Sequence, residues 1–371
     1  MKGTDSRGEP STRPGPVLSQ DLLARIPLKP QATVPQRVWH LAVAGYLYLA
    51  AMGAGAFIVA VVLDWFGLRL AAIYVSPIGG WAWDWSEALV LWGPLLAAVG
   101  ASFLLLHLGR NWFLFPTAWR NLRSSWLARG FVILSTFIIV GMMLAAAAVF
   151  LPHWLNRLPV LWRVAQAVGL VLAVGTAVYT SVLLTSKKYF PAWTEPVVPF
   201  LFLAFSLSTG VGGLVVGAAA YRALAADPSS ADAIVSALET AMLTLVVVEA
   251  ALLVLYVRHL RGGKPEAQLS ATMLLSGSWS PAFWAGIVGG ALVLPLVLGV
   301  FDLAVGSDLL PVYLLPVAAA VGLLVGGFLL RLGILAVGVR EAPPLYKLSR
   351  WRAEHSAEPN TPPRLAGRQE Q

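Results

Sequence analysis

Two neighbouring apolar runs within residues 163–221 carry hydroxyl side chains that a lipid-facing segment normally excludes. Tyr179-Thr180-Ser181 stands before the short turn that joins the runs, and Ser206-Leu207-Ser208-Thr209 stands after it. Polar groups in hydrocarbon cost free energy unless they have a partner, so they usually face a packed interior or a ligand. These residues therefore predict a membrane protein that holds something polar inside its helix bundle.

Two charged residues stand inside later apolar runs. Glu249 lies nine residues before Arg258, and Arg331 lies nine before Arg340. At about 1.5 Å rise per residue, both side chains fall roughly 13 Å from the same membrane face. A membrane interior tolerates such charges by pairing them, and equal depth allows these two to form a buried ion pair. The pair would either clamp two helices together or form one step of a proton path, and the sequence leaves both readings open.

The composition sets the class of protein that must position these residues. Of 371 residues, 58% are hydrophobic and 12% are charged, whereas a soluble domain has roughly 45–50% apolar and about 25% charged residues. The sequence has no cysteine, which excludes disulfides, thiolate nucleophiles and Cys-ligated iron–sulfur clusters within it. The expected fold is an all-α integral membrane protein.

Apolar runs of the length that spans a bilayer recur along the chain. They predict a bundle of about eight transmembrane helices within residues 39–340, at 39–63, 86–108, 128–151, 163–185, 197–221, 237–257, 282–303 and 311–339. Residues 1–38 and 341–371 are polar and rich in proline, which predicts flexible tails. The first tail shows no cleavable signal peptide, so we expect the first helix to serve as an uncleaved signal.

The distribution of Lys and Arg predicts the orientation. An even number of helices puts both termini on one side, and 21 of the 26 Lys and Arg residues fall on that side. The loops of the opposite side hold only Arg69, Arg157, Arg163 and Arg222. The positive-inside rule therefore predicts a multi-pass protein of the cytoplasmic membrane with both termini in the cytoplasm.

Polar residues from five predicted helices converge on the side of the membrane that carries both termini. The second and fourth helices end on that side, and the first, third and fifth begin there. These polar residues include Tyr46, His107, Arg110, Arg129 and Tyr179. The five histidines of the sequence do not provide two facing ligands within the membrane, so neither haem nor another metal is expected.

The order and spacing of these motifs resemble the NrfD/PsrC-like family, to which the membrane subunit of polysulfide reductase belongs. The resemblance covers all eight predicted helices. The motifs that carry it are Trp39-His40, Tyr46-Leu47-Tyr48-Leu49, Leu106-His107-Leu108-Gly109-Arg110, Ser125-Trp126-Leu127-Ala128-Arg129-Gly130, Tyr179-Thr180-Ser181, Pro191-Ala192-Trp193, the run from Leu201 to Gly210, Glu249, and Gly326-Gly327-Phe328-Leu329-Leu330-Arg331.

The resemblance implies a quinone-reactive membrane anchor that holds no metal of its own. Such anchors exchange electrons between menaquinone or ubiquinone and a docked iron–sulfur subunit of the four-cluster ferredoxin type, which serves a molybdopterin catalytic subunit. The positions that match the family's quinone contacts are Tyr46 and Tyr179. With the polar groups on the same side, the expected quinone-binding set is Tyr46, Tyr179, His107, Arg110, Thr180, Ser206 and Ser208. Lys187, Lys188 and Trp193 are the expected docking residues for the partner.

Two other functions stay open at this point. The protein could be a proton-conducting member of the same family within a larger respiratory complex, in which case Glu249, Arg331 and Asp64 would form the path. It could instead be a secondary transporter, although its helix-breaking residues do not recur in two matching halves as inverted repeats would. Membrane lipid is an expected partner in every case, and nucleic acid is not.

Overall fold

The computed structural model describes residues 41–68, 72–73, 83–108, 119–150, 157–224, 229–305 and 314–341. Within these ranges the protein is a bundle of helices, which confirms the expected fold class. The predicted tails lie outside the described residues, except for Glu341. The helices are α2 (Leu41–Trp65), α3 (Trp85–Leu108), α5 (Trp126–Phe150), α7 (Pro159–Thr185), η1 (Pro191–Trp193), α8 (Val198–Leu224), α9 (Ser229–Gly262), α10 (Pro265–Leu275), η2 (Ala282–Val293), α11 (Leu294–Val305) and α12 (Leu314–Ala336).

Each of the eight predicted spans corresponds to a helix. Seven of the described helical segments are long and apolar enough to cross a membrane. The remaining prediction, 86–108, corresponds to α3, a helix of 24 residues whose central apolar stretch is Val90–Phe103. The seventh span joins η2, a π-helix, to α11 without a break.

The structure also contains elements that hydropathy did not predict. The region between the sixth and seventh spans, expected to be a loop, contains α10, and α9 begins at Ser229 rather than near residue 237. A short antiparallel ladder pairs β1 (Ala72–Ile73) with β2 (Trp83–Asp84) between α2 and α3. These elements are short or moderately polar, and a criterion of about 20 apolar residues does not detect them.

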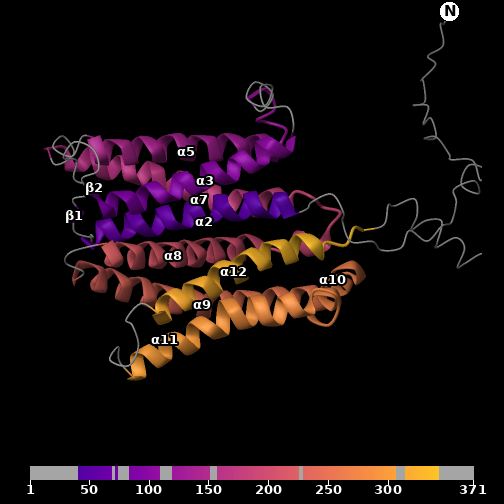
Figure 1. Cartoon of the computed structure of the whole chain (residues 1–371). Coiled ribbons are helices and arrows are strands. Elements are labelled where there is room, and N and C mark those ends of the chain that lie inside the picture. The colour runs from indigo at the N-terminus through magenta and orange to yellow at the C-terminus, as the bar shows by residue number, and fades with distance from the viewer. Residues whose placement is uncertain are drawn as a thin grey trace, which may run out of the picture. The chain divides into compact units, whose positions relative to one another are not determined.

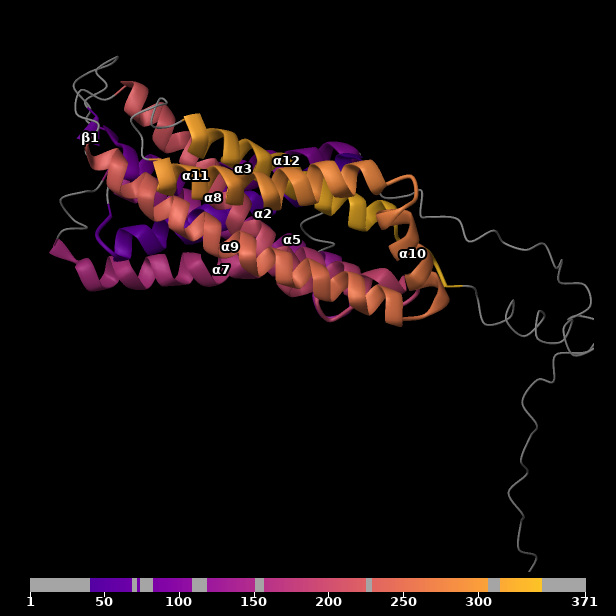
Figure 2. The ribbon, with the colours of Figure 1, turned by 90° about the horizontal axis from the view of Figure 1, so that it is seen from below.

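Helices α2 and α8 form the centre of the bundle. In the apolar window of each, 67% of residues are buried inside the protein, against 28% for α9 at the periphery. Helix α2 packs against α3, α7, α8 and α12, while α8 also packs against α9 and α12. Figure 1 shows the helices running alongside one another, and the view in Figure 2 shows the same arrangement from below.

Small residues let the two central helices approach closely. A Cβ atom added at Gly55 of α2 would overlap the backbone carbonyl of Ser206 in α8, and one added at Gly210 of α8 would overlap the backbone at Ala56. Lipid tails are as apolar as the helix surfaces, so close van der Waals packing of this kind is a main source of helix association in membranes. The Gly53-Ala54-Gly55-Ala56 run of α2 therefore sets the position of the serines of α8.

The terminal face is the end of the bundle at which α2 begins and α12 ends (Figure 1). Its loops are tied to one another by specific contacts. The backbone N–H of Glu341 donates to the carbonyl oxygen of Tyr189 at 2.7 Å, and Lys264 forms an ion pair with the carboxylate of Glu341 at 3.3 Å. The hydroxyl of Tyr256 donates to the carbonyl oxygen of Ala192 at 3.1 Å. The segments that follow α7, α9 and α12 therefore form one connected surface.

We expect Gly55→Ala to lower the thermal stability of the purified protein in detergent. The added methyl group must push α2 and α8 apart, and overpacking typically costs about 1–3 kcal/mol. Gly45→Ala, on the same helix, is the matched control because a Cβ there meets nothing within 4 Å. Thermal unfolding followed by tryptophan fluorescence would measure both variants. Equal stability of the two would contradict the role assigned to this close contact.

Candidate functional site

Tyr46 of α2 and Tyr179 of α7 form a buried pair near the terminal face. Their exposed fractions are 2% and 7%, and their hydroxyl groups interact with each other. The ring of Tyr179 lies against Gly130 of α5, where an added Cβ atom would overlap the ring carbons. Three helices therefore build this tyrosine pair: α2 and α7 supply the hydroxyls, and α5 supplies the space for one ring.

Thr180 stands next to Tyr179 and is fully buried. Its hydroxyl donates to the carbonyl oxygen of Ala177 at 3.4 Å in its own helix. Ser181 does the same with Val178 at 2.6 Å. Bonds of this kind satisfy a hydroxyl inside a membrane helix without a partner from elsewhere. Of the three adjacent hydroxyls, only that of Tyr179 reaches another helix.

Tyr48 lies two residues after Tyr46 and takes part in a second cluster. Its hydroxyl donates to the carbonyl oxygen of Leu324 in α12 at 2.8 Å, and its ring meets that of Phe328 edge-on at 5.5 Å. The guanidinium carbon of Arg331 lies 5.8 Å from the centre of the same ring. Residues two apart on a helix point in nearly opposite directions. One turn of α2 thus contributes Tyr46 to the tyrosine pair on one face and Tyr48 to the cluster around Arg331 on the other.

Arg331 is completely buried, and its guanidinium is held mainly by α8. One Nη2 hydrogen points to the hydroxyl oxygen of Ser206 at 2.8 Å and another to the carbonyl oxygen of Phe202 at 3.4 Å. Nη1 donates to the carbonyl oxygen of Gly327 at 3.5 Å. The guanidinium carbon also lies 5.4 Å from the ring centre of Phe202, a cation–π contact.

Glu249 of α9 is also completely buried, and its partner is again a serine of α8. The hydroxyl of Ser208 donates to Oε1 of Glu249, while Oε2 has no hydrogen-bond partner within the described part of the protein. Nε of Arg331 is in the same state. Glu249 and Arg331 influence each other electrostatically, but within the described residues they form no direct ion pair within 4 Å. The structure links the two charges through Ser206 and Ser208 of α8.

We call Tyr48, Ser206, Ser208, Glu249 and Arg331 the polar core. Four helices contribute to it: α2, α8, α9 and α12. An uncompensated charge in a low-dielectric interior costs several kcal/mol, so each of these hydrogen bonds offsets part of a large desolvation cost. Of the two atoms without a partner, Oε2 of Glu249 can accept a proton or a hydrogen bond, whereas the Nε–H of Arg331 can only donate a hydrogen bond.

Other residues expected at the site lie elsewhere. Asp64 stands near the opposite end of α2, where Nε2 of Gln166 donates to its carboxylate at 2.8 Å, and Oε1 of Gln166 accepts from the indole of Trp65 at 2.8 Å. These contacts place Asp64 in a separate group at the far end of the bundle from the tyrosine pair. Arg110 lies outside the described residues, as does the side chain of His107.

The expected docking residues divide into two groups. Lys187 and Lys188 are exposed at the terminal face. Trp193, in contrast, is only 1% exposed: its indole N–H donates to the carbonyl oxygen of Ile334 at 2.8 Å, and its ring stacks on Phe190 at 4.2 Å. A side chain enclosed in this way anchors the loop to α12, and of the three expected docking residues only the two lysines are exposed.

Glu195 follows Trp193 in the loop, and its carboxyl group is partly buried. Burial raises its pKa above the ordinary value, and the nearby His259 of α9 acts in the opposite direction. This links the loop before α8 to the end of α9. Among the described residues no group of three His, Cys, Asp or Glu side chains could hold a metal ion.

Sequence reasoning did not assign a role to Tyr48 or to Gly130. Both lie within motifs that carry the family resemblance, but these motifs do not reveal which residues they contact. The two-residue spacing of Tyr46 and Tyr48 was an available signal, because it places them on opposite faces of one helix. The sequence also indicates that Ser206 and Ser208 lie within a membrane helix, but it does not indicate that they contact Arg331 and Glu249.

The amino-acid sequence matches a family of known proteins. The family model described as "Polysulphide reductase, NrfD" matches residues 30–341. The C subunit of polysulfide reductase from Wolinella succinogenes is 28% identical over 277 residues, which is 71% of the present sequence and 83% of the relative. Protein NrfD of Escherichia coli K12 is 28% identical over 322 residues, 81% of the present sequence and 95% of the relative. A Haemophilus influenzae NrfD homologue is 23% identical over 287 residues, 72% of the present sequence and 84% of the relative.

A double-mutant cycle tests whether the polar core couples its two charges. Arg331→Met removes the cation near Glu249, and we expect it to destabilise the protein by about 3–5 kcal/mol, because it leaves the buried charge of Glu249 without a compensating cation. Glu249→Gln removes the anion. In the double variant the combined loss should fall short of the sum by about 0.5–3 kcal/mol, the range for interacting neighbours. Thermal unfolding in detergent measures all three, and strict additivity would show that the charges act independently.

Proposed function

This protein belongs to the polysulphide reductase NrfD family, and from that premise we propose that it is the quinone-binding membrane subunit of a multi-subunit respiratory oxidoreductase. The relatives that it matches along most of their length are named as a part of polysulfide reductase and as NrfD proteins. In this proposal the cofactor is menaquinone or ubiquinone. The partners are a four-cluster iron–sulfur subunit and a molybdopterin catalytic subunit.

The observation that supports quinone binding most strongly is the tyrosine pair. Tyr46 and Tyr179 bring two buried hydroxyl groups together from helices that are not consecutive in the sequence. The pair lies toward the terminal face, and apolar residues of α2, α5 and α7 surround it. A mostly apolar site with a few convergent polar groups suits a ring that carries two oxygen atoms and a long apolar tail.

Quinol, when bound, supplies two electrons and two protons. A tyrosine hydroxyl has one proton and accepts hydrogen bonds through the same oxygen, so it can receive a proton while it passes its own on. Tyr179 can therefore take up a proton at its hydroxyl oxygen and release one to that of Tyr46. Such a relay needs the two hydroxyls close together, and their side chains do interact. The ring of Tyr179 also packs against Gly130 of α5, which restricts its position.

The exposed surface at the terminal face supports the proposed docking of the iron–sulfur partner. Lys187 and Lys188 extend from the loop after α7, only a few residues beyond Tyr179. Electrostatic complementarity would attract an acidic partner to these lysines. Electrons must travel a short distance between the ring and the partner's cluster, and the loop is held firmly by Trp193 and Tyr256.

The polar core supports a second candidate function, the movement of protons through the bundle. Its charges are enclosed by four helices, and Glu249 and Arg331 each keep one atom without a hydrogen-bond partner in the described residues. A carboxylate with a free oxygen atom next to serine hydroxyls can bind and release a proton. This function adds to quinone binding and does not replace it, because the two clusters occupy different faces of α2.

We expect Tyr179→Phe to slow quinol-dependent electron transfer by roughly 10²-fold, the lower range for loss of a positioned acid–base group. The change removes one oxygen atom and leaves the ring against Gly130, so assembly with the partner subunits should be retained. Turnover with a quinol analogue, in membranes that contain the whole complex, measures the effect. Tyr221→Phe is the matched control. Tyr221 is also buried, but it lies near the end of α8 that is remote from the terminal face. Wild-type turnover of Tyr179→Phe would exclude Tyr179 from the reaction.

A proton-conducting polar core predicts that Glu249→Gln lowers the number of protons translocated per electron while electron transfer in the presence of an uncoupler continues. Gln keeps the size of the side chain and can still accept from Ser208, but it cannot release a proton. Proteoliposomes with an internal pH dye report the ratio. Glu266→Gln, in α10 outside the spans, is the control. If both variants translocate protons as the wild type does, the polar core is purely structural.

A further inference from the structure

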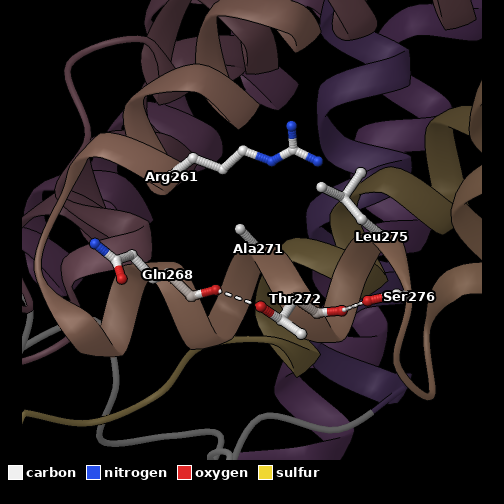
Figure 3. Close-up of a pocket in the computed structure, with 6 residues that line it drawn as sticks. All are labelled: Arg261, Gln268, Ala271, Thr272, Leu275 and Ser276. Carbon is white, nitrogen blue, oxygen red and sulfur yellow. Dashed lines mark hydrogen bonds between the residues drawn. The ribbon is translucent and has the colours of Figure 1, made fainter.

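A cavity of about 240 Å³ lies between the last turn of α9 and α10, apart from the tyrosine pair and the polar core. Its lining consists of Arg261, Gln268, Ala271, Thr272, Leu275 and Ser276. In Figure 3 the side chain of Arg261 extends across the cavity toward Leu275, while the other residues come from α10 and its C-terminal end. The cavity therefore combines one cation, two hydroxyls and an amide above a small apolar wall.

Arg261 has no carboxylate partner in the described part of the protein. The nearby Lys264 forms an ion pair with Glu341, but within those same residues Arg261 forms neither an ion pair nor a hydrogen bond. A guanidinium presents several N–H donors in a planar arrangement that suits phosphate oxygens. The hydroxyls of Thr272 and Ser276 donate to helix carbonyls at 3.0 and 3.2 Å, and a hydroxyl at an exposed position can exchange such a bond for one to a phosphate.

Aromatic and apolar neighbours indicate the depth of this cavity in the membrane. The indole N–H of Trp284 donates to the carbonyl oxygen of Leu275, a residue that lines the cavity, at 2.9 Å, and the Trp284 ring is half exposed. Such amphipathic rings prefer the level of the lipid headgroups. Val254 and Leu255 lie one to two turns before Arg261 in α9 and expose apolar side chains. The cation thus stands at headgroup level with a lipid-facing surface next to it.

We propose that this cavity binds the phosphate of an anionic phospholipid headgroup, with Arg261 as the principal ligand. The acyl chains would lie along the exposed apolar surface of α9 and η2. The bound lipid would brace α10 against α9, and α10 in turn packs against η1, the segment that contains the buried Trp193. This site is independent of quinone binding, so its failure would leave the proposed function untouched.

The test uses the full-length protein, delipidated in detergent and titrated with phosphatidylglycerol or phosphatidylcholine. Native mass spectrometry counts the lipids retained, and thermal unfolding reports the stabilisation. We expect the wild type to retain phosphatidylglycerol over phosphatidylcholine and Arg261→Gln to reduce that retention about tenfold. Arg258→Gln is the matched control: it removes the same charge from the same exposed end of α9, but Arg258 does not line the cavity. It should behave as the wild type.

The variant Gln268→Glu and the competing ligand inorganic phosphate distinguish a lipid site from other anion sites. Gln268→Glu puts a competing carboxylate into the cavity without removing Arg261, and it should weaken phosphatidylglycerol retention as well. Equal retention by the wild type and both cavity variants would overturn the proposal. Competition by millimolar inorganic phosphate at the same affinity would identify a free-anion site and overturn the assignment to lipid. So would an Arg261→Gln variant that loses its partner subunits but keeps its lipid, because the cavity would then bind an acidic group of a protein.

Discussion

The absence of water inside a membrane constrains this structure more than any other factor, because a polar atom in the bundle costs free energy unless the protein itself supplies a partner. Glu249 and Arg331 impose the most demanding case, and α8 meets it by placing Ser208 beside one and Ser206 beside the other. This is possible only because α8 is central and approaches α2 through Gly55 and Gly210. The close packing of small residues between α2 and α8 is therefore what allows the bundle to accommodate the two buried charges.

Helix α2 connects the two clusters on which the functional proposals rest. Tyr46 turns toward α7 and Tyr48 toward α12, so a displacement of one turn of α2 would disturb both the tyrosine pair and the polar core. A movement of α2 would then couple the proposed proton transfer at Tyr46 to the position of the charge at Arg331. Coupling between the two clusters requires that α2 have two stable positions, because only a two-state element can transmit a change at one site to another.

The proposed quinone-binding site and the proposed docking surface both lie at the terminal face. The loop between α7 and α8 begins close to Tyr179 and is fixed by Trp193 on α12 and Tyr256 on α9, while its lysines stay exposed. A loop that is fixed by Trp193 and Tyr256 and that exposes two positive charges suits the docking of another protein. The cavity at Arg261 belongs to the same end of the bundle, so a lipid bound there, as we propose, would contact α10.

The sequence by itself determined the class of protein, the number and approximate limits of the long helices, and the family, because long apolar runs and ordered motifs are local properties. Through the family resemblance it also placed Tyr46 and Tyr179 in one expected quinone-binding site. It did not reveal that Tyr48 faces α12, that Arg331 and Glu249 meet serines of α8, or that Trp193 is enclosed. Only the tertiary structure decided these points. Helices that are apolar on all sides carry little amphipathic signal, so their hydropathy cannot tell which face meets lipid and which meets a neighbour.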